Sequence, residues 1–223
     1  MKRVLSVLIA CEESQAECLA FRKLGHNAFS CDIQPCKRGG VPEWHIQGDV
    51  TPFLHGETRF KVQNGVQFDV PGWDLIIAHP PCTYLCKISS LQMAANADYN
   101  IMWRGHIKRV NRNRYDQMIA ARSFFFECLN AAAPFVAVEN PIPMAIARLP
   151  RPSCYACPSW FGVKYTKKTL YWLKNLPPIM ATLDFPNPKE FVRNSRGKYR
   201  SRTFPELAYA LADQWSRYIL DNS

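Results

Sequence analysis

The amino-acid sequence predicts an α/β fold in which helices cover both faces of a mostly parallel sheet. Short apolar runs at residues 4–10, 74–78 and 134–138 have the unbroken hydrophobic pattern of strands buried on both faces. The segments between and after these runs carry apolar residues at helical spacing. Because strands that alternate with helices usually pair in parallel, the order of the segments predicts the fold class.

The first three elements form a strand, helix and strand unit. Residues 4–10 are the first strand, and residues 13–24 are an amphipathic helix that Gly25 closes. Residues 27–31 are a second, short strand that ends in Asp32. A βαβ unit of this kind is the building block of Rossmann-like sheets.

The rest of the chain continues the alternation. Strands are predicted at residues 74–78, 134–138 and 170–173, and helices at residues 115–132 and 205–220. Two prolines, Pro80 and Pro81, stop the strand at residue 78 because proline cannot continue a central ladder.

Length and composition favour one globular domain over residues 1–223. The chain is 48% hydrophobic and 21% charged, which excludes a disordered or coiled-coil protein. The nine cysteines are odd in number and follow no export signal, so we expect reduced thiols and a cytoplasmic location. No apolar run approaches the roughly 18 residues of a membrane span, so we expect no membrane partner.

The net charge of +10 is concentrated in two short windows. Residues 104–114 hold five basic residues and no acid, and residues 193–202 hold another five and no acid. The windows take ten of the 28 basic residues, so the rest of the chain, with 18 acids, is formally neutral. Two local patches of this kind predict a phosphate-bearing partner.

Acidic residues follow the predicted strands where a parallel sheet binds its ligands, at the carboxyl ends of the strands. Asp32, about 20 residues after the first turn, has the position of an acid that holds a ribose diol. Asp49 can accept a hydrogen bond from an adenine amino group, and Gly48 before it allows close approach of the backbone. These residues predict a nucleoside-bearing cofactor.

A candidate nucleophile follows the strand at residues 74–78. Pro80 and Pro81 hold the backbone rigid and leave Cys82 at the mouth of the strand, while Glu139 ends a neighbouring strand. We therefore expect a thiol and an acid in one pocket. A thiol with a pKa near 8.5 needs activation at neutral pH, and His79 and the basic loop at 104–114 are the candidates for it.

Pro-Pro-Cys after one strand and Glu-Asn after the next resemble the catalytic core of the cytosine-C5 DNA methyltransferases. The chain is more closely similar to a short phage and prophage group labelled DNA cytosine methyltransferase. The resemblance spans residues 4–215. It rests on residues 8–15, 31–35, 44–50, 74–82, 139–141 and 203–205.

The resemblance implies a Rossmann-like, S-adenosylmethionine-dependent methyltransferase fold and methyl transfer to C5 of cytosine in DNA. Cys82 would add to C6, Glu139 would bind and protonate N3, and Asp32 and Asp49 would hold the ribose and adenine of S-adenosylmethionine. The chemistry agrees, because cytosine C5 becomes nucleophilic only when a thiolate adds to C6 and an acid neutralises N3.

The predicted site has three groups of residues and no metal. The catalytic group is Cys82, Glu139, Pro81 and Asn140. The cofactor-binding group is Cys11, Glu12, Glu13, Ser14, Asp32, Ile33, Asp49, Val50, His79 and Pro80. The substrate- and phosphate-binding group is Arg104, Lys108, Arg109, Arg112, Arg114, Lys167, Lys168, Arg200 and Arg202, of which the last four are candidates for cytosine O2.

The chain departs from the larger family members at three points. Cys11 to Ser14 replace the glycine-rich first turn, and Thr83 follows Cys82 where the larger enzymes carry Gln. In addition, 223 residues leave no room for a separate target-recognition domain. DNA is the predicted substrate, and a free cytidine nucleotide, dCMP or CMP, is the alternative.

Three other interpretations compete with this one. An amino-methyltransferase would need Asp, Asn or Ser before the two prolines and an aromatic residue after them, where this chain has His79 and Cys82. A zinc site would join Cys154 and Cys157 to two further cysteines, Cys31 and Cys36. A catalytically silent nucleic-acid-binding protein would stack bases on Trp44, Tyr84, Trp103 and Trp160.

Overall fold

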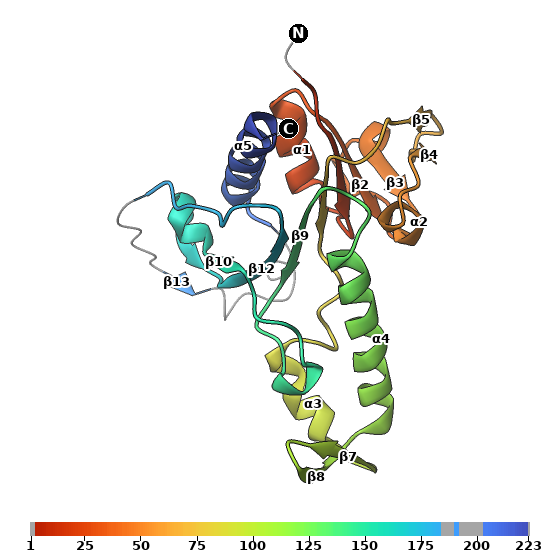
Figure 1. The fold of residues 1–223 in the computed structure, drawn as a ribbon, viewed down its shortest axis with the longest axis vertical. Helices are drawn as coiled ribbons and strands as arrows, with labels where there is room; N and C mark the ends of the chain where they lie inside the picture. Colours follow the sequence, from red (N-terminus) through yellow and green to blue (C-terminus); the bar gives the residue numbers. More distant parts are fainter. Residues whose placement is uncertain (1–2, 184–189, 192–202, 223) are drawn as a thin grey trace.

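The computed structural model describes residues 3–183, 190–191 and 203–222, which form a seven-stranded sheet with helices packed on it (Figure 1). The strand order is β10-β12-β9-β6-β1-β2-β3. The strands are β1 Ser6–Ala10, β2 Asn27–Asp32, β3 His45–Gln47, β6 Leu75–Ala78, β9 Phe135–Asn140, β10 Cys154–Ala156 and β12 Thr169–Lys174.

Five of these strands are parallel and follow the doubly wound order. Taken in chain order, β1, β2, β3, β6 and β9 lie side by side as 3-2-1-4-5. At the other edge β12 runs antiparallel to β9, and β10 runs antiparallel to β12. The order reverses between β1 and β6, so the crevice that binds ligands in such sheets lies at their carboxyl ends.

Helices cover both faces of the sheet. Alternate residues of β1 point to opposite faces, so Val7 and Ile9 pack under α1 (Ala16–Lys23) and α5 (Pro205–Asp221). Leu8 and Ala10 pack under α2 (Thr51–Leu54) and α4 (Arg112–Leu129) on the other face. The predicted fold class, a Rossmann-like α/β fold with a mostly parallel sheet, is confirmed.

Three predicted elements differ in their boundaries. The first helix begins at Ala16 rather than residue 13, because residues 11–15 form a turn in which Cys11 and Gln15 have positive φ. Helix α4 begins three residues early, where the Asn111 side chain accepts a hydrogen bond from the N–H of Arg114 at 3.0 Å. Strand β9 runs on to Asn140, so Glu139 lies within the strand and does not follow it.

Small elements surround the sheet. The two-stranded pairs are β4 Arg59–Lys61 with β5 Gln67–Asp69, β7 Tyr99–Trp103 with β8 His106–Val110, and β11 Tyr165–Thr166 with β13 Glu190–Phe191. The short helices are η1 Pro42–Trp44, η2 Lys87–Ser89, α3 Ser90–Ala94, η3 Ala145–Ala147 and η4 Pro158–Phe161. Within the described ranges, no helix is long and apolar enough to cross a bilayer.

A projection extends from one end of the molecule. It consists of α3, the β7–β8 hairpin and the first turns of α4, and it lies at the bottom of Figure 1. The basic window at residues 104–114 is in this projection. The prediction of a basic loop there was wrong, because the window forms strand β8 and the start of α4.

Candidate active site

Strands β6 and β9 bring the predicted nucleophile and acid to the same edge of the sheet. They pair in parallel with Ala78 opposite Val138, so the residues that follow, His79 and Glu139, emerge side by side. The side-chain amide of Asn140 donates to the carbonyl of Pro80 at 3.2 Å. This bond ties the diproline to the end of β9, so Asn140 holds the backbone that carries Cys82.

The loops that follow the two strands are also bonded to each other. We refer to residues 79–86 as the Cys82 loop and to residues 141–147 as the β9 loop. The N–H of Lys87 donates to the carbonyl of Ile142 at 2.8 Å, and the N–H of Met144 donates to that of Leu85 at 2.7 Å. Cys86 and Pro143 form an antiparallel bridge between these two bonds. The backbone thereby fixes the position of Cys82 relative to Glu139.

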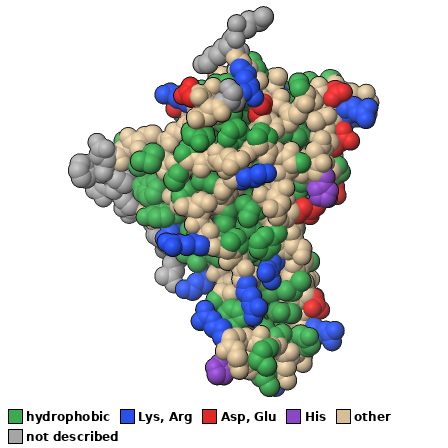
Figure 2. All heavy atoms as spheres, viewed as in Figure 1, with side chains coloured by type: hydrophobic (Ala, Val, Ile, Leu, Met, Phe, Trp, Pro, Cys, Tyr) green, Lys and Arg blue, Asp and Glu red, His purple; other side chains and the backbone are tan. Residues whose placement is uncertain are grey.

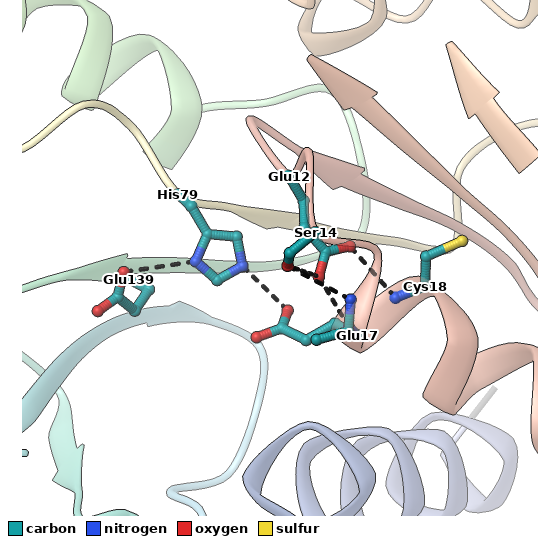
Figure 3. Close-up of polar contacts among 7 residues, drawn as sticks. Glu12, Ser14, Glu17, Cys18, His79 and Glu139 are labelled. Carbon is teal, nitrogen blue, oxygen red and sulfur yellow. Dashed lines mark hydrogen bonds and ion pairs between the residues drawn. The ribbon is translucent and has the colours of Figure 1, made fainter. Parts of the chain in front are cut away.

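A histidine lies between two acidic side chains at the base of the site (Figure 3). His79 Nε2 lies 3.1 Å from Glu17 Oε2, and His79 Nδ1 lies 3.4 Å from Glu139 Oε2. Burial alone would lower the pKa of His79, but the charges of Glu17 and Glu139 and their hydrogen bonds raise it well above its usual value. The ring is therefore an imidazolium that both carboxylates share.

This arrangement determines the ionisation of the predicted acid. Burial alone would raise the pKa of Glu139, but the hydrogen bond from His79 and the charge of Lys167 outweigh burial and lower it. Both ring nitrogens of His79 face carboxylates rather than the thiol of Cys82. His79 therefore contacts Glu139 and Glu17 and not Cys82, the residue that it was expected to activate.

A second thiol lies beside the predicted nucleophile. The N–H groups of Leu85 and Cys86 both donate to the carbonyl of Cys82, at 3.0 and 2.9 Å, and this turn brings the two cysteines together. The contact with Cys86, burial and the Glu139 charge raise the pKa of Cys82. The hydroxyl of Ser89 donates to the carbonyl of Thr83 at 2.6 Å, so in its 3.3 Å contact with Cys86 Sγ it accepts from the thiol. The turn therefore places a second thiol against Cys82.

Sequence reasoning missed Cys86 and Glu17. Cys86 lies four residues after Cys82, and only the turn at residues 82–86 makes that spacing a contact. Glu17 falls beside Ala20 and Leu24 on the apolar face of the helix, and its side chain is fully buried against His79. A charged residue in the apolar face of a short helix is the signal that points to it.

The predicted cofactor residues Cys11, Asp32 and Asp49 come together at the ends of β1, β2 and β3. Burial and the charges of Asp32 and Asp49 raise the pKa of Cys11 to about 12. Asp32 accepts a hydrogen bond from the N–H of Gln34 at 2.8 Å, and Asp49 accepts one from the N–H of Thr51 at 3.0 Å. Ile33, which follows Asp32 in the chain, is 72% exposed, and Val50, which follows Asp49, is buried.

The first turn is built around Glu12. Its carboxylate accepts hydrogen bonds from the N–H groups of Glu17 at 2.8 Å and Cys18 at 3.3 Å, which satisfies the start of α1. Burial and the charge of Glu17 raise the pKa of Glu12 to about 7. Ser14 lies beside it, with its hydroxyl 3.5 Å from the carboxylate. Glu12 therefore ties the turn at residues 11–15 to the start of α1.

The loop at residues 34–41 closes over this turn. The side chain of Gln15 accepts from the N–H of Val41 at 2.7 Å and donates to the carbonyl of Val41 at 3.0 Å. The carbonyl of Glu13 accepts from the N–H of Lys37 at 3.0 Å. Gly40 packs so closely that a Cβ there would lie 2.5 Å from Gln15 Oε1. These contacts fix the turn without the glycine-rich sequence of the larger enzymes.

The predicted phosphate-binding residues fall into separate groups. Those of the projection are Arg104, Lys108 and Arg109 on the β7–β8 hairpin and Arg112 and Arg114 in the first turn of α4. Lys167 lines a narrow cleft with Glu139, and the ammonium of Lys168 lies 4.2 Å from the centre of the Tyr155 ring. Arg200 and Arg202, with the rest of the second basic window, lie outside the described residues.

A groove of about 460 Å³ separates the projection from the β9 loop. Lys87, Trp103, Lys108 and Met144 are among the residues that line it. The guanidinium groups of Arg104 and Arg148 each lie 5.2 Å from the centre of the Trp103 ring. The groove is therefore lined by both apolar and basic side chains.

The structure bears on the residues named in two of the competing interpretations. Cys31 lies on β2 and Cys154 on β10, with four strands between them, so the four-cysteine zinc site was wrong. The four aromatic residues form no common stacking surface, because Tyr84 and Trp103 pack on one face of the sheet and Trp44 and Trp160 on the other.

Comparison with known proteins identifies similar solved structures only. No protein-family profile and no curated protein matches the chain. One similar structure is described as a DNA modification methyltransferase encoded within an E. coli prophage, with a TM-score of 0.42 and 14% identity over 76% of this chain and 46% of that one. Another is a mutant of Spodoptera frugiperda DNMT2, with a TM-score of 0.38 and 13% identity over 84% of this chain and 54% of that one. The chain matches about half the length of each.

Proposed function

We propose that this protein is an S-adenosylmethionine-dependent methyltransferase that acts on C5 of cytosine in DNA through a Cys82 adduct at C6. One observation carries the proposal: the bonded loops after β6 and β9 hold a cysteine and a glutamate over the same end of the sheet. Addition to a pyrimidine ring requires this pair of groups, a nucleophile at C6 and an acid at N3.

The residues at the ends of β1, β2 and β3 fit S-adenosylmethionine. Asp32 and Asp49 are two carboxylates at neighbouring strand ends, suited to the ribose hydroxyls and the adenine amino group, and the exposed Ile33 offers an apolar surface to the base. When bound, S-adenosylmethionine supplies an electrophilic methyl group. Asp32 and Asp49 would hold it, and the turn at residues 11–15, fixed by the hydrogen bonds of Glu12 and Gln15, would line its site.

In the proposed reaction the Cys82 thiol gives its proton to water and its sulfur adds to C6 of cytosine. Glu139 receives a proton from the His79 imidazolium and presents it to N3, which neutralises the charge that develops on the ring. C5 then takes the methyl group and gives its hydrogen as a proton to water. Departure of the Cys82 sulfur from C6 as a thiolate, with return of the N3 proton to Glu139, restores the aromatic ring and yields 5-methylcytosine.

Transfer of a labelled methyl group tests this proposal. Wild-type protein with methyl-labelled S-adenosylmethionine should label cytosine-containing duplex DNA at C5, and Cys82→Ser should reduce the rate by at least about 1,000-fold. Cys157→Ser, which changes another half-exposed cysteine, should retain the wild-type rate. Calorimetry should show that Cys82→Ser still binds S-adenosylmethionine and that Asp32→Ala does not.

Two results would contradict the proposal. Methyl transfer by Cys82→Ser at the wild-type rate would show that the Cys82 thiol takes no part in the reaction. Methylation of dCMP at the same rate as DNA would make the protein a nucleotide enzyme, which is the alternative reading of the same site.

A further inference from the structure

The β7–β8 hairpin presents an unusual outer face. Its register pairs Met102 with Ile107, and the next pair on the same face is Asn100 with Arg109. The side chains of Met102 and Ile107 are 65% and 71% exposed, whereas Val110 on the inner face is fully buried. Two large apolar side chains thus lie together in solvent, on the face opposite the half-buried Ile101 and Trp103 and the buried Val110.

The turn of the hairpin places an arginine at its tip. Arg104 has φ 50° and Gly105 has φ 81°, the left-handed pair of a two-residue hairpin turn. Glycine takes this conformation freely, but arginine pays a conformational cost that asparagine or glycine at residue 104 would avoid. A cation held at a strained position at the end of the ribbon indicates a role in contact with a ligand.

The surroundings of the apolar pair are basic. Arg104, His106, Lys108 and Arg109 are all exposed, and the window at residues 104–114 contains no acid. The lower half of the face drawn in Figure 2 shows Lys and Arg side chains beside hydrophobic ones, with few acidic side chains among them. Arg109 shares the outer face with the apolar pair, whereas His106 and Lys108 lie on the opposite face of the ribbon. An exposed apolar pair on a ribbon that carries basic side chains is complementary to a polyanion whose interior is apolar.

The hairpin is joined directly to the segment that follows Cys82. Helix η2 and helix α3 continue the Cys82 loop, and Lys87 and Ser90 from them line the groove together with Lys108 and Arg109 of the hairpin. The N–H of Asn111 donates to the carbonyl of Met93 at 2.8 Å, which fixes the end of β8 to α3. A duplex that contacts the hairpin would therefore bind an element that α3 and η2 connect to the Cys82 loop.

We propose that the β7–β8 hairpin enters the major groove of B-form DNA beside the target cytosine, where Met102 and Ile107 contact base edges and Arg104 contacts phosphate. This inference rests on the proposed function, for which it names the element that engages the substrate. The major groove of B-form DNA, about 12 Å wide, admits a two-stranded ribbon, and its apolar thymine methyl groups suit methionine and isoleucine. The narrow major groove of A-form RNA does not admit side chains.

Binding measurements in the Cys82→Ser background, without cofactor, test the inference independently of catalysis. Fluorescence anisotropy should show that Met102→Ser with Ile107→Ser weakens binding of a labelled DNA duplex at least about tenfold, with an unchanged salt slope. Arg104→Ala should reduce the log-log salt slope by about 0.9, the value for one phosphate contact. An RNA duplex of the same sequence should bind at least about tenfold more weakly than the DNA.

The control is Met180→Ser, which removes a methionine side chain of similar exposure, 68%, at a site outside the hairpin. Its DNA affinity should equal that of the parent, and the melting temperatures of all variants should agree because each change is on the surface.

The inference is overturned if the double variant binds DNA within twofold of the parent, if DNA and RNA duplexes bind alike, or if the parent binds no duplex. It is also overturned if sedimentation shows a dimer that the double variant dissociates without loss of DNA affinity, which would assign the face to a second copy. Hairpin-dependent DNA binding by a chain that transfers no methyl group would contradict the proposed function alone.

Discussion

The pKa of Cys82 is higher than that of an isolated thiol. The neighbouring Cys86, burial and the charge of Glu139 raise the pKa of Cys82. His79, the residue expected to activate the thiol, contacts Glu17 and Glu139 instead. The contact of Cys82 with Cys86 arises from the turn at residues 82–86, which the sequence pattern around the diproline does not reveal.

The His79 imidazolium stabilises the fold in a pH range that its raised pKa defines. Its stabilisation is complete below about pH 6.5, the usual pKa of histidine, and is lost as the pH rises through the higher pKa of the folded state. We expect His79→Gln to lower the free energy of unfolding by about 3 kcal/mol at pH 6, because the buried carboxylate of Glu17 and the partly buried one of Glu139 lose their counterion. The difference should shrink toward pH 10.

Urea unfolding of both proteins across pH 6–10 measures this difference. His55→Gln is the matched control, since His55 forms an exposed ion pair with Glu127 at 3.0 Å and should contribute less than about 1 kcal/mol. A wild-type advantage over His79→Gln that stays constant across this range would show that the charge of His79 is unimportant.

Helix α4 begins after a single capping residue, Asn111. Asn111 caps the helix through the N–H of Arg114, and its side-chain amide also donates to the carbonyl of Ala95 at 3.3 Å. The cap therefore holds the first turn of α4, with Arg112 and Arg114, against the end of α3.

Removal of this cap should cost about 1 kcal/mol of folding stability in Asn111→Ala. Asn111→Asp keeps the acceptor and should lose less than half as much. Asn130→Ala, at the other end of α4, removes only a donor to the carbonyl of Phe126 and serves as the control. Equal stability of Asn111→Ala and wild type in urea unfolding would show that α4 needs no cap.

Periodicity predicted the buried elements well and the exposed ones poorly. The strands at residues 74–78 and 134–138 were confirmed with small shifts, because both of their faces are buried and their side chains are uniformly apolar. The β7–β8 hairpin was missed because its outer face is exposed and its turn, Arg104-Gly105, lacks the asparagine or aspartate that usually marks a two-residue turn. Five basic residues in one window also resemble a solvated loop.

In the whole molecule, the sheet carries the proposed active site and the projection carries the hairpin proposed to contact DNA. The sheet gathers Asp32, Asp49, Cys82 and Glu139 at the carboxyl ends of its parallel strands, a convergence that follows from parallel pairing and was predictable. The antiparallel edge of β12 and β10 was not predictable, because strand direction depends on connections that short apolar runs do not encode.

Covalent capture of cytosine tests the central claim of this account, that Cys82 is the nucleophile. A 5-fluorocytosine duplex cannot lose fluorine as a cation after methyl transfer, so the enzyme should remain joined to C6. With S-adenosylmethionine, wild-type protein should form a denaturant-stable adduct that peptide mapping places on Cys82. The adduct should be absent without the cofactor and in Cys82→Ser. An adduct mapped to Cys86 or another residue, or methyl transfer without any adduct, would contradict the account.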